Sequence, residues 1–237
     1  MKTISNTIIL SLLLCATPLT CFAGGLNDMF GVWGSLTLQG DFSAISPELD
    51  KFHWRITNQT RSRDDDHTQT RFTENILFTQ AGYQINEHAS VWLGYVHNWI
   101  DPLHKSSFQE SRPYQDFVWK QRFNDYKFMM RIRMDERIHT NTGDAGYRLR
   151  QLIQVGHAVP FIDNLSSYIG YEVLFYLNNS GFGRSGVAEN RVYTGLNYQL
   201  TKAAGVSIGY MGQHVDRRGA NDLFTHNIQI DMHYRFF

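Results

Sequence analysis

The last fourteen residues of the chain, Phe224–Phe237, alternate between apolar and polar side chains. Apolar residues recur at Ile228, Ile230, Met232, Tyr234 and Phe236, and polar residues fill the positions between them. A period of two is the spacing of a β-strand, whose successive side chains point to opposite faces. The pattern therefore predicts a strand with one apolar face and one polar face, followed by Phe237 at the end of the chain.

Similar alternation recurs along the chain, in about eleven segments that turn-forming residues separate. Several exceed the roughly 5–6 residues of an ordinary globular strand. They match the roughly 9–11 residues that a tilted strand needs to cross a membrane. The segments are Val32–Phe42, Phe52–Arg61, Thr70–Ile85, Ala89–Ile100, Tyr114–Phe123, Tyr126–Ile138, Tyr147–Val159, Leu165–Leu177, Glu189–Leu200, Gly205–Val215 and Thr225–Phe237.

Short and long connections alternate between these segments, which is the layout of outer-membrane barrels. We therefore predict an all-β fold, a transmembrane antiparallel up-and-down β-barrel of about ten strands, with short periplasmic turns and longer outer loops. Single-chain bacterial barrels have an even strand number, so the segment around Trp33 is interpreted as an irregular leader before ten strands. The alternative is twelve strands.

The N-terminus has the features of a secretory signal peptide. Lys2 precedes the apolar run Ile8–Leu14, and Ala23 is a small residue suited to cleavage. We predict a cleaved signal over residues 1–23 and a single barrel domain over residues 24–237. Both cysteines, Cys15 and Cys21, lie in the signal, so the mature chain has no disulfide, thiolate metal site or cysteine nucleophile. The expected location is the outer membrane of a Gram-negative bacterium.

The charges balance, with 22 basic and 22 acidic residues. This balance argues against nucleic acid as a partner, because nucleic-acid binding needs a basic patch. The expected partners are outer-membrane lipid and the barrel-assembly machinery, which would recognise the C-terminal strand. No cofactor and no metal site is expected from the sequence.

A row of charged residues has the spacing of one strand face. It begins on Tyr126–Ile138 and continues on the next three segments. Lipid exposure of an arginine near the membrane midplane costs about 2–4 kcal/mol, so the row is expected to face the lumen. It either fills the lumen and holds strands in register, or forms a cationic constriction that selects anions. Its members are Arg131, Arg133, Asp135, Arg137, Arg148, Arg150, Glu172 and Arg191.

Histidines gather toward the predicted outer rim, where they provide a second candidate site. A histidine there could serve as a general base beside a serine in a membrane-embedded hydrolase, or it could be an ordinary polar rim residue. The candidates are His97, His139, His214 and His226, with Asp216 next to His214.

Several motifs resemble one family. They include the Arg…Gly-Tyr…Leu-Gly-Tyr pattern across Arg71–Tyr95, the arginine-rich strand Arg131–Arg137, Asn190-Arg191 with Tyr193, and Ile208-Gly209-Tyr210-Met211. Together they resemble the domain-of-unknown-function 2490 family over about Trp33 to Phe237. The resemblance implies an outer-membrane β-barrel, and it brings no catalytic residues to this chain.

Three functions stay open on the sequence. The first is a narrow channel or a structural outer-membrane element with a charged Arg/Glu/Asp lumen. The second is a lipid-modifying or hydrolytic enzyme that uses a rim histidine. The third is surface adhesion or binding through the outer loops.

Overall fold

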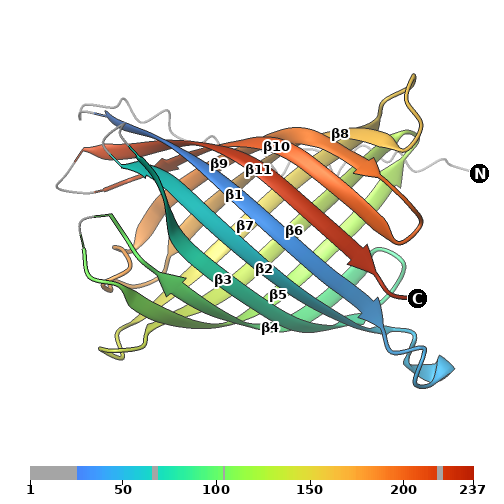
Figure 1. Cartoon of the computed structure of the whole chain (residues 1–237). Coiled ribbons are helices and arrows are strands. Elements are labelled where there is room, and N and C mark those ends of the chain that lie inside the picture. Colours follow the sequence, from blue (N-terminus) through green and yellow to red (C-terminus); the bar gives the residue numbers. More distant parts are fainter. Residues whose placement is uncertain (1–25, 66–68, 104, 218–220) are drawn as a thin grey trace, which may run out of the picture.

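Eleven β-strands close into a single barrel in the computed structural model, which describes residues 26–65, 69–103, 105–217 and 221–237 (Figure 1). The predicted all-β barrel is thereby confirmed, whereas the predicted signal peptide lies outside the described residues. One short 3-10 helix, η1 (Pro47–Leu49), follows the first strand. The strands are β1 (Leu26–Asp41), β2 (Phe52–Asp65), β3 (Gln69–Gln84), β4 (Ala89–Ile100), β5 (Phe108–Phe123), β6 (Tyr126–His139), β7 (Ala145–Ala158), β8 (Leu165–Tyr176), β9 (Gly186–Gln199), β10 (Ala204–Val215) and β11 (Asp222–Arg235).

The barrel closes through a parallel pair. Neighbouring strands are antiparallel everywhere except between β1 and β11, which pair from Leu26↔Asp222 to Gln39↔Arg235. Eleven strands fall within the predicted ten to twelve, but the interpretation of the Trp33 segment as an irregular leader is wrong. Trp33 lies within β1, which also pairs with β2. The prediction of an even strand number assumed that the first and last strands pair antiparallel. A parallel pair also satisfies the backbone groups of both edge strands, and it closes a barrel that has an odd number of strands.

Strand β5 begins six residues earlier than predicted, at Phe108 rather than Tyr114. The predicted segments leave Pro113 in the preceding loop, and proline is unfavourable inside a strand because it cannot donate to the ladder. The structure keeps Pro113 inside the strand: β4 continues to pair with it, whereas pairing with β6 stops at Ser111 and resumes at Tyr114. The missing N–H therefore falls where the ladder is interrupted.

Short turns and longer loops occupy opposite ends of the barrel. The end where β11 finishes carries the connections 85–88, 124–125, 159–164 and 200–203, and the opposite end carries 101–107, 140–144, 177–185 and 216–221. Asn124, with a φ of 51°, starts the two-residue turn between β5 and β6, where asparagine tolerates the left-handed backbone. The connection 42–51 departs from the pattern, because it is long and lies at the short-turn end.

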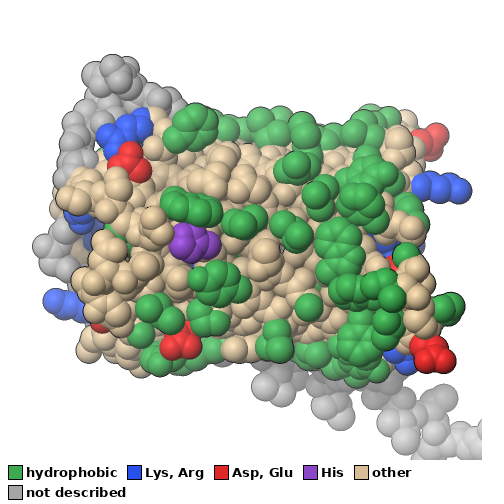
Figure 2. All heavy atoms as spheres, turned by 60° about the horizontal axis from the view of Figure 1, so that its bottom comes forward, with side chains coloured by type: hydrophobic (Ala, Val, Ile, Leu, Met, Phe, Trp, Pro, Cys, Tyr) green, Lys and Arg blue, Asp and Glu red, His purple; other side chains and the backbone are tan. Residues whose placement is uncertain are grey.

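Apolar side chains cover the outer face of the barrel, most densely toward the short-turn end, which lies at the right of Figure 2. Leu93, Ile169, Ile208 and Met232 are between 53% and 68% exposed, although each belongs to a regular strand. Polar and charged residues such as Glu110, Asn98 and Asn227 are buried in the interior. The arrangement is inverted relative to a water-soluble protein, in which large apolar side chains are mostly buried.

No helix in the described part of the chain has the length and apolar character needed to cross a membrane.

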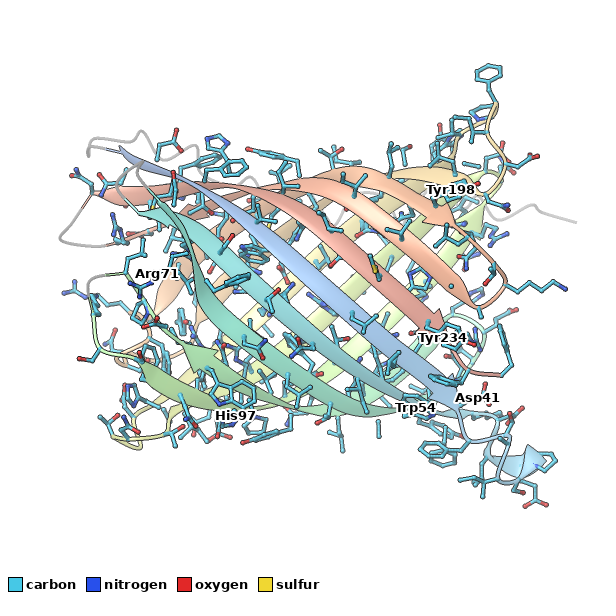
Figure 3. All side chains as sticks on the ribbon, in the orientation of Figure 1. Asp41, Trp54, Arg71, His97, Tyr198 and Tyr234 are labelled. Carbon is cyan, nitrogen blue, oxygen red and sulfur yellow. The ribbon has the colours of Figure 1, made fainter. Side chains whose placement is uncertain are left out.

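Polar side chains on the outer face occur in hydrogen-bonded pairs. Each of the five hairpins that turn at the long-loop end has such a pair across its two strands, and pairing lowers the cost of placing a polar group in an apolar medium. His97 of one pair points outward from β4 (Figure 3). The pairs are Asn58–Asn75, His97–Gln109, Glu136–Tyr147, Tyr171–Asn190 and Tyr210–His226.

Candidate functional site in the barrel lumen

A cavity of about 1140 Å³ occupies the inside of the barrel. Its walls include Gln39 and His233, near the short-turn end, and Arg184 and Arg217, in the loops of the opposite end. The lining therefore extends along the whole length of the barrel. Eight-stranded barrels are filled by their own side chains, and 16–18-stranded porins hold a wide aqueous channel, so a partly filled lumen suits eleven strands.

Basic residues dominate the surface of this cavity. Thirteen basic side chains line it against four acidic ones. The cavity surface is thus strongly cationic, although the whole chain has a net charge of zero. The acidic residues are Glu74, Glu189, Asp216 and Asp231. The basic residues are Arg55, Arg61, Arg63, Lys105, Arg112, Arg131, Arg133, Arg137, Arg148, Arg150, Arg184, Arg191 and Arg217.

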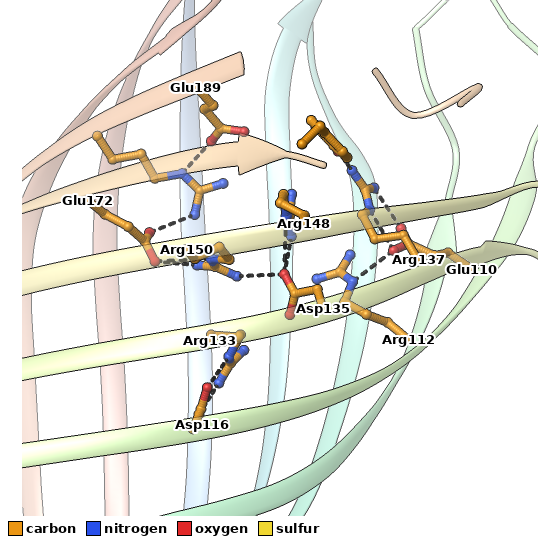
Figure 4. Close-up of polar contacts among 12 residues, drawn as sticks. Glu110, Arg112, Asp116, Arg133, Asp135, Arg137, Arg148, Arg150, Glu172 and Glu189 are labelled. Atoms are coloured by element: carbon orange, nitrogen blue, oxygen red, sulfur yellow. Dashed lines mark hydrogen bonds and ion pairs between the residues drawn. The ribbon is translucent and has the colours of Figure 1, made fainter. Parts of the chain in front are cut away.

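Further carboxylates lie behind these guanidinium groups, against the barrel wall. The side chains of Glu110, Asp135 and Glu172 are completely buried and that of Asp116 is 4% exposed, and none of them lines the cavity. Their partners are arginines of β5, β6, β7 and β9, and the ion pairs form three separate groups, around Asp116, around Glu110, and around Asp135 and Glu172 (Figure 4). Buried carboxylates need such partners, because an unpaired buried charge is strongly unfavourable.

Bidentate contacts fix some of these ion pairs. Arg133 donates from Nε and Nη2 to the two carboxylate oxygens of Asp116, both at 2.6 Å. Arg137 donates in the same way to Glu110, at 2.7 and 2.8 Å. Such paired N–H···O bonds orient the planar guanidinium as well as neutralising it. The arginines are therefore held in defined positions around the cavity.

Glu172 is shared by three arginines. Its Oε1 accepts from Arg131 Nη2 at 2.7 Å and from Arg150 Nη2 at 2.8 Å, and its Oε2 lies 3.5 Å from Arg191 Nη1. Tyr193 donates its hydroxyl to Oε2 at 2.8 Å. One negative charge thus faces three positive charges at this point, although Arg191 also contacts Glu189.

Several of the guanidinium groups stack on aromatic rings. The guanidinium carbon of Arg61 lies 3.7 Å from the ring centre of Trp33, and that of Arg133 lies 4.0 Å from the ring centre of Tyr114. Stacking of this kind stabilises a cation by about 0.5–1 kcal/mol at exposed sites, and by about 2 kcal/mol where water is excluded. The rings therefore add to the orientation that the carboxylates provide.

The connection between β8 and β9 contributes to the cavity wall at the long-loop end of the barrel. Its residues from Ser180 to Arg184 line the cavity, and the ring of Phe182 lies under the guanidinium of Arg137 at 4.3 Å. Asn178 holds the loop in place by donating to the carbonyl of Ala145 at 2.9 Å. At this end of the cavity an aromatic ring is thus stacked on a basic side chain.

The structure brings together all eight charged residues that the sequence placed in the lumen. Asp135 and Glu172 are buried, and the six arginines line the cavity. Glu110 and Arg112 were not predicted, because they precede Tyr114, where the predicted strand begins. The period-two row Glu110, Arg112, Tyr114 and Asp116 carries the signal that could have identified them.

Other missed residues are the Arg61–Glu74 ion pair, 3.1 Å long, and Glu189. Glu189 follows the same period-two spacing as Arg191 and Tyr193. Arg61 and Glu74 lie directly opposite each other in the β2–β3 ladder, next to the register shift between Arg61 and Ser62. Which residues of the two strands face each other is not indicated by the periodicity of either strand.

The rim histidines do not meet in one place. His97 lies on the outer face of β4 and contacts Gln109, whereas His139 stacks on Phe108, a residue of the cavity lining, with ring centres 4.7 Å apart. His214 and His226 lie on the outer-facing rows of β10 and β11.

Acidic partners exist for two of these histidines. His214 Nε2 lies 3.2 Å from Asp222, and His226 Nε2 lies 3.0 Å from Asp28, while its Nδ1 contacts the hydroxyl of Tyr210. Among the described residues, the hydrogen bonds and ring contacts of the His97, His139 and His226 side chains involve no serine hydroxyl. Asp216 lines the lumen cavity instead. A histidine-dependent enzyme stays a prediction.

The C-terminal strand presents its apolar row outward. Ile230, Met232 and Tyr234 are more than 40% exposed, and the alternate residues Gln229 and Asp231 line the cavity. Strand β11 ends at Arg235, after which the Phe236 N–H donates to the Gln39 carbonyl at 2.9 Å. Ile228 belongs to the same outward row, and Phe237 is 75% exposed.

Within the described residues, no three histidine, cysteine, aspartate or glutamate side chains are placed to hold a metal ion.

The fold and the lumen define a class, small closed β-barrels with a charged interior and an apolar exterior. Within it, the chain belongs to the family described as "Protein of unknown function (DUF2490)", which matches residues 30–224. The resemblance that the sequence motifs indicated is thereby confirmed.

Two other comparisons give distant likenesses. An uncharacterised protein of Methylorubrum extorquens (strain AM1) is 25% identical over 164 residues, which cover 68% of this chain and 72% of that protein. Among solved structures, the outer-membrane expressed OmpT of Vibrio cholerae matches with a TM-score of 0.39 at 12% identity. That match covers 72% of this chain and 57% of the OmpT chain, which is less than two thirds of it.

The packing of Tyr114 gives a testable prediction. A Cβ atom added at Gly94 would lie 2.1 Å from the Tyr114 ring, whereas one added at Gly34 would have no neighbour closer than 3.5 Å. Gly94→Ala should therefore displace Tyr114 and lower the free energy of unfolding by about 1–3 kcal/mol, as overpacking does. Gly34→Ala is the matched control. Urea unfolding of both variants in detergent measures the difference, and equal stabilities would contradict the observed packing.

Proposed function

We propose that the protein is an outer-membrane barrel whose lumen is a narrow channel selective for anions. The observation that carries this proposal is the composition of the cavity surface, thirteen basic side chains against four acidic ones. Adding the four buried carboxylates Glu110, Asp116, Asp135 and Glu172 still leaves an excess of five positive charges. Charged rings of one sign select ions of the other sign in narrow pores.

The placement of the carboxylates supports a conducting role over a purely structural one. A network that only held strands in register would serve equally well with either sign of charge facing the cavity. Here four carboxylates lie against the wall and their arginine partners face the cavity. An entering anion would therefore meet guanidinium groups along the whole path.

A membrane location is supported by the outer face. Its apolar side chains gather toward the short-turn end, and aromatic residues lie at that edge, as lipid-facing barrels require. Trp54, Tyr198 and Tyr234 lie there in Figure 3. The ring of Phe236 lies 5.6 Å from that of Trp54 and 4.9 Å from that of Tyr234. We place this edge at the periplasmic boundary of the outer membrane.

The lipid-facing surface can be tested by charge insertion. Ile169 is 60% exposed on strand β8, and Phe161 is 93% exposed in the neighbouring turn. Ile169→Arg should reduce the free energy of folding into lipid vesicles by about 2–4 kcal/mol, the value for an arginine at midplane. Phe161→Arg should fold normally, because the turn lies in water. Normal folding of both variants would argue against lipid contact at Ile169.

Channel activity can be tested in planar bilayers with refolded protein whose heat-modifiable migration on a gel demonstrates a folded barrel. Under a potassium chloride gradient, the reversal potential should have the sign of chloride selectivity. Arg55→Glu should move this potential toward zero, because Arg55 lines the cavity and has no carboxylate within 4 Å among the described residues; its Nε donates to Gln39.

Lys202→Glu provides the control for the channel test. It makes the same charge change at an exposed turn residue outside the cavity lining and should leave the reversal potential unchanged. Cation selectivity of the wild type would overturn the proposal. Absence of conductance from folded protein would also overturn it, and would favour a structural role in the outer membrane.

We also propose that β11 is recognised by the barrel-assembly machinery. Its support is the outward apolar row that ends in Phe236 and Phe237. Deletion of these two residues should reduce the amount of barrel in outer-membrane fractions relative to the full chain, and an unchanged amount would contradict this role.

A further inference from the structure

The most uneven distribution of charge in the lumen lies around Glu172. Three guanidinium groups, those of Arg131, Arg150 and Arg191, converge on this single carboxylate, which is completely buried. Arg150 lies 3.8 Å from Asp135, and Arg191 contacts Glu189, so each has a second acidic neighbour. Arg131 contacts no carboxylate other than Glu172 in the described part of the chain. Its positive charge is therefore the least neutralised of the three.

Arg131 is also the most accessible of these groups. Its side chain is 23% exposed, against 9% for Arg150 and 8% for Arg191, and it lines the cavity. Its Nη2 donates to Glu172, while its Nε is buried and has no hydrogen-bond partner among the described residues. A buried N–H without an acceptor is unfavourable, and native proteins usually supply one. The Nη1 group of Arg131 is not buried and has no hydrogen bond in the described part of the chain, so it is the donor that a ligand oxygen in the cavity would reach.

The register places the three arginines and Glu172 on neighbouring strands. Arg131 of β6 is opposite Leu152 of β7, Leu152 is opposite Glu172 of β8, and Glu172 is opposite Arg191 of β9. Arg150 lies two residues from Leu152 on β7, on the same face. The guanidinium groups therefore come from β6, β7 and β9, and Glu172 comes from β8, which lies between β7 and β9. The hydrogen-bonded sheet and the shared carboxylate hold them together without a ligand.

We infer that Arg131, supported by Arg150 and Arg191, forms a binding site for an oxyanion of the phosphate class inside the lumen. This inference rests on the proposed anion channel and deepens it, because it names the preferred ion. A tetrahedral oxyanion offers several acceptor oxygens to the planar guanidinium fork, whereas chloride offers no such geometry.

Inorganic phosphate is the probe for the binding test. Titration calorimetry on folded protein in detergent should detect saturable binding of phosphate, with sodium chloride at the same ionic strength as the control for screening. Arg131→Gln should weaken phosphate binding by about tenfold or more, the loss expected for one charge-assisted hydrogen bond. Arg131→Lys keeps the charge but removes the fork, so it should restore only part of the affinity.

A matched control is Arg63→Gln. Arg63 lines the same cavity but belongs to β2, away from Glu172, so this variant should bind phosphate as the wild type does. Equal weakening by Arg63→Gln and Arg131→Gln would mean general attraction to a cationic lumen and would overturn the site. Heat-modifiable migration verifies that each variant is folded.

Bilayer recordings separate the failure of this site from the failure of the channel. Phosphate should reduce the chloride current of the wild type in a saturable manner, and Arg131→Gln should relieve this block. Chloride-selective current without phosphate block or binding would overturn the site and leave the channel intact. Absence of current together with calorimetric binding that depends on Arg131 would overturn the channel and keep the site.

Discussion

The structure depends on closure of the sheet. A barrel without a free edge satisfies every ladder hydrogen bond within itself, and here the closing contact is the parallel pair β1–β11. Once the sheet is closed, each strand has one row of side chains outside and one inside. The polar lumen and the apolar exterior follow from that geometry, because a one-residue shift in register would exchange the two rows.

Closure also explains how the lumen is organised without an extensive apolar core. The inward apolar cluster is small, formed by Ile76, Val96 and Tyr114 with Phe78 packed against it. On the wall from β5 to β9, ion pairs take the place of apolar packing. Carboxylates have short side chains and stay near the wall, whereas the long arginine side chains reach over them toward the cavity. This difference in length gives the lumen surface its positive character, although the whole chain carries no net charge.

Much of this architecture could be predicted from the sequence, because the period-two pattern is a local property. Strand β4 has the bounds that the alternation indicated, Ala89–Ile100, and the inward row Arg131, Arg133, Asp135 and Arg137 follows from the same spacing. The start of β5, residues 108–113, was predicted as loop, although a proline disrupts a strand only where its N–H would be needed. In this barrel the position of Pro113 coincides with an interruption of the β5–β6 ladder, which depends on the partner strand.

The remaining features depend on contacts between distant residues, which one sequence does not specify. The parallel closure depends on how the first and last strands meet, and the sharing of Glu172 by three arginines depends on the register of four strands. The same holds for the histidines. Residues that lie equally close to the outer rim can point either into the lumen or out of the barrel. Asp216 lines the cavity, whereas His97 points away from it.

The composition of a barrel therefore constrains its function less than the direction in which each charged side chain points. Equal numbers of basic and acidic residues could give a neutral lumen, a cationic lumen or an anionic one. What decides between them is which member of each ion pair is buried against the wall. In this protein Glu110, Asp116, Asp135 and Glu172 lie outside the cavity lining, whereas their arginine partners belong to it. The cavity surface is therefore mainly cationic, and such a surface favours an anion over a cation.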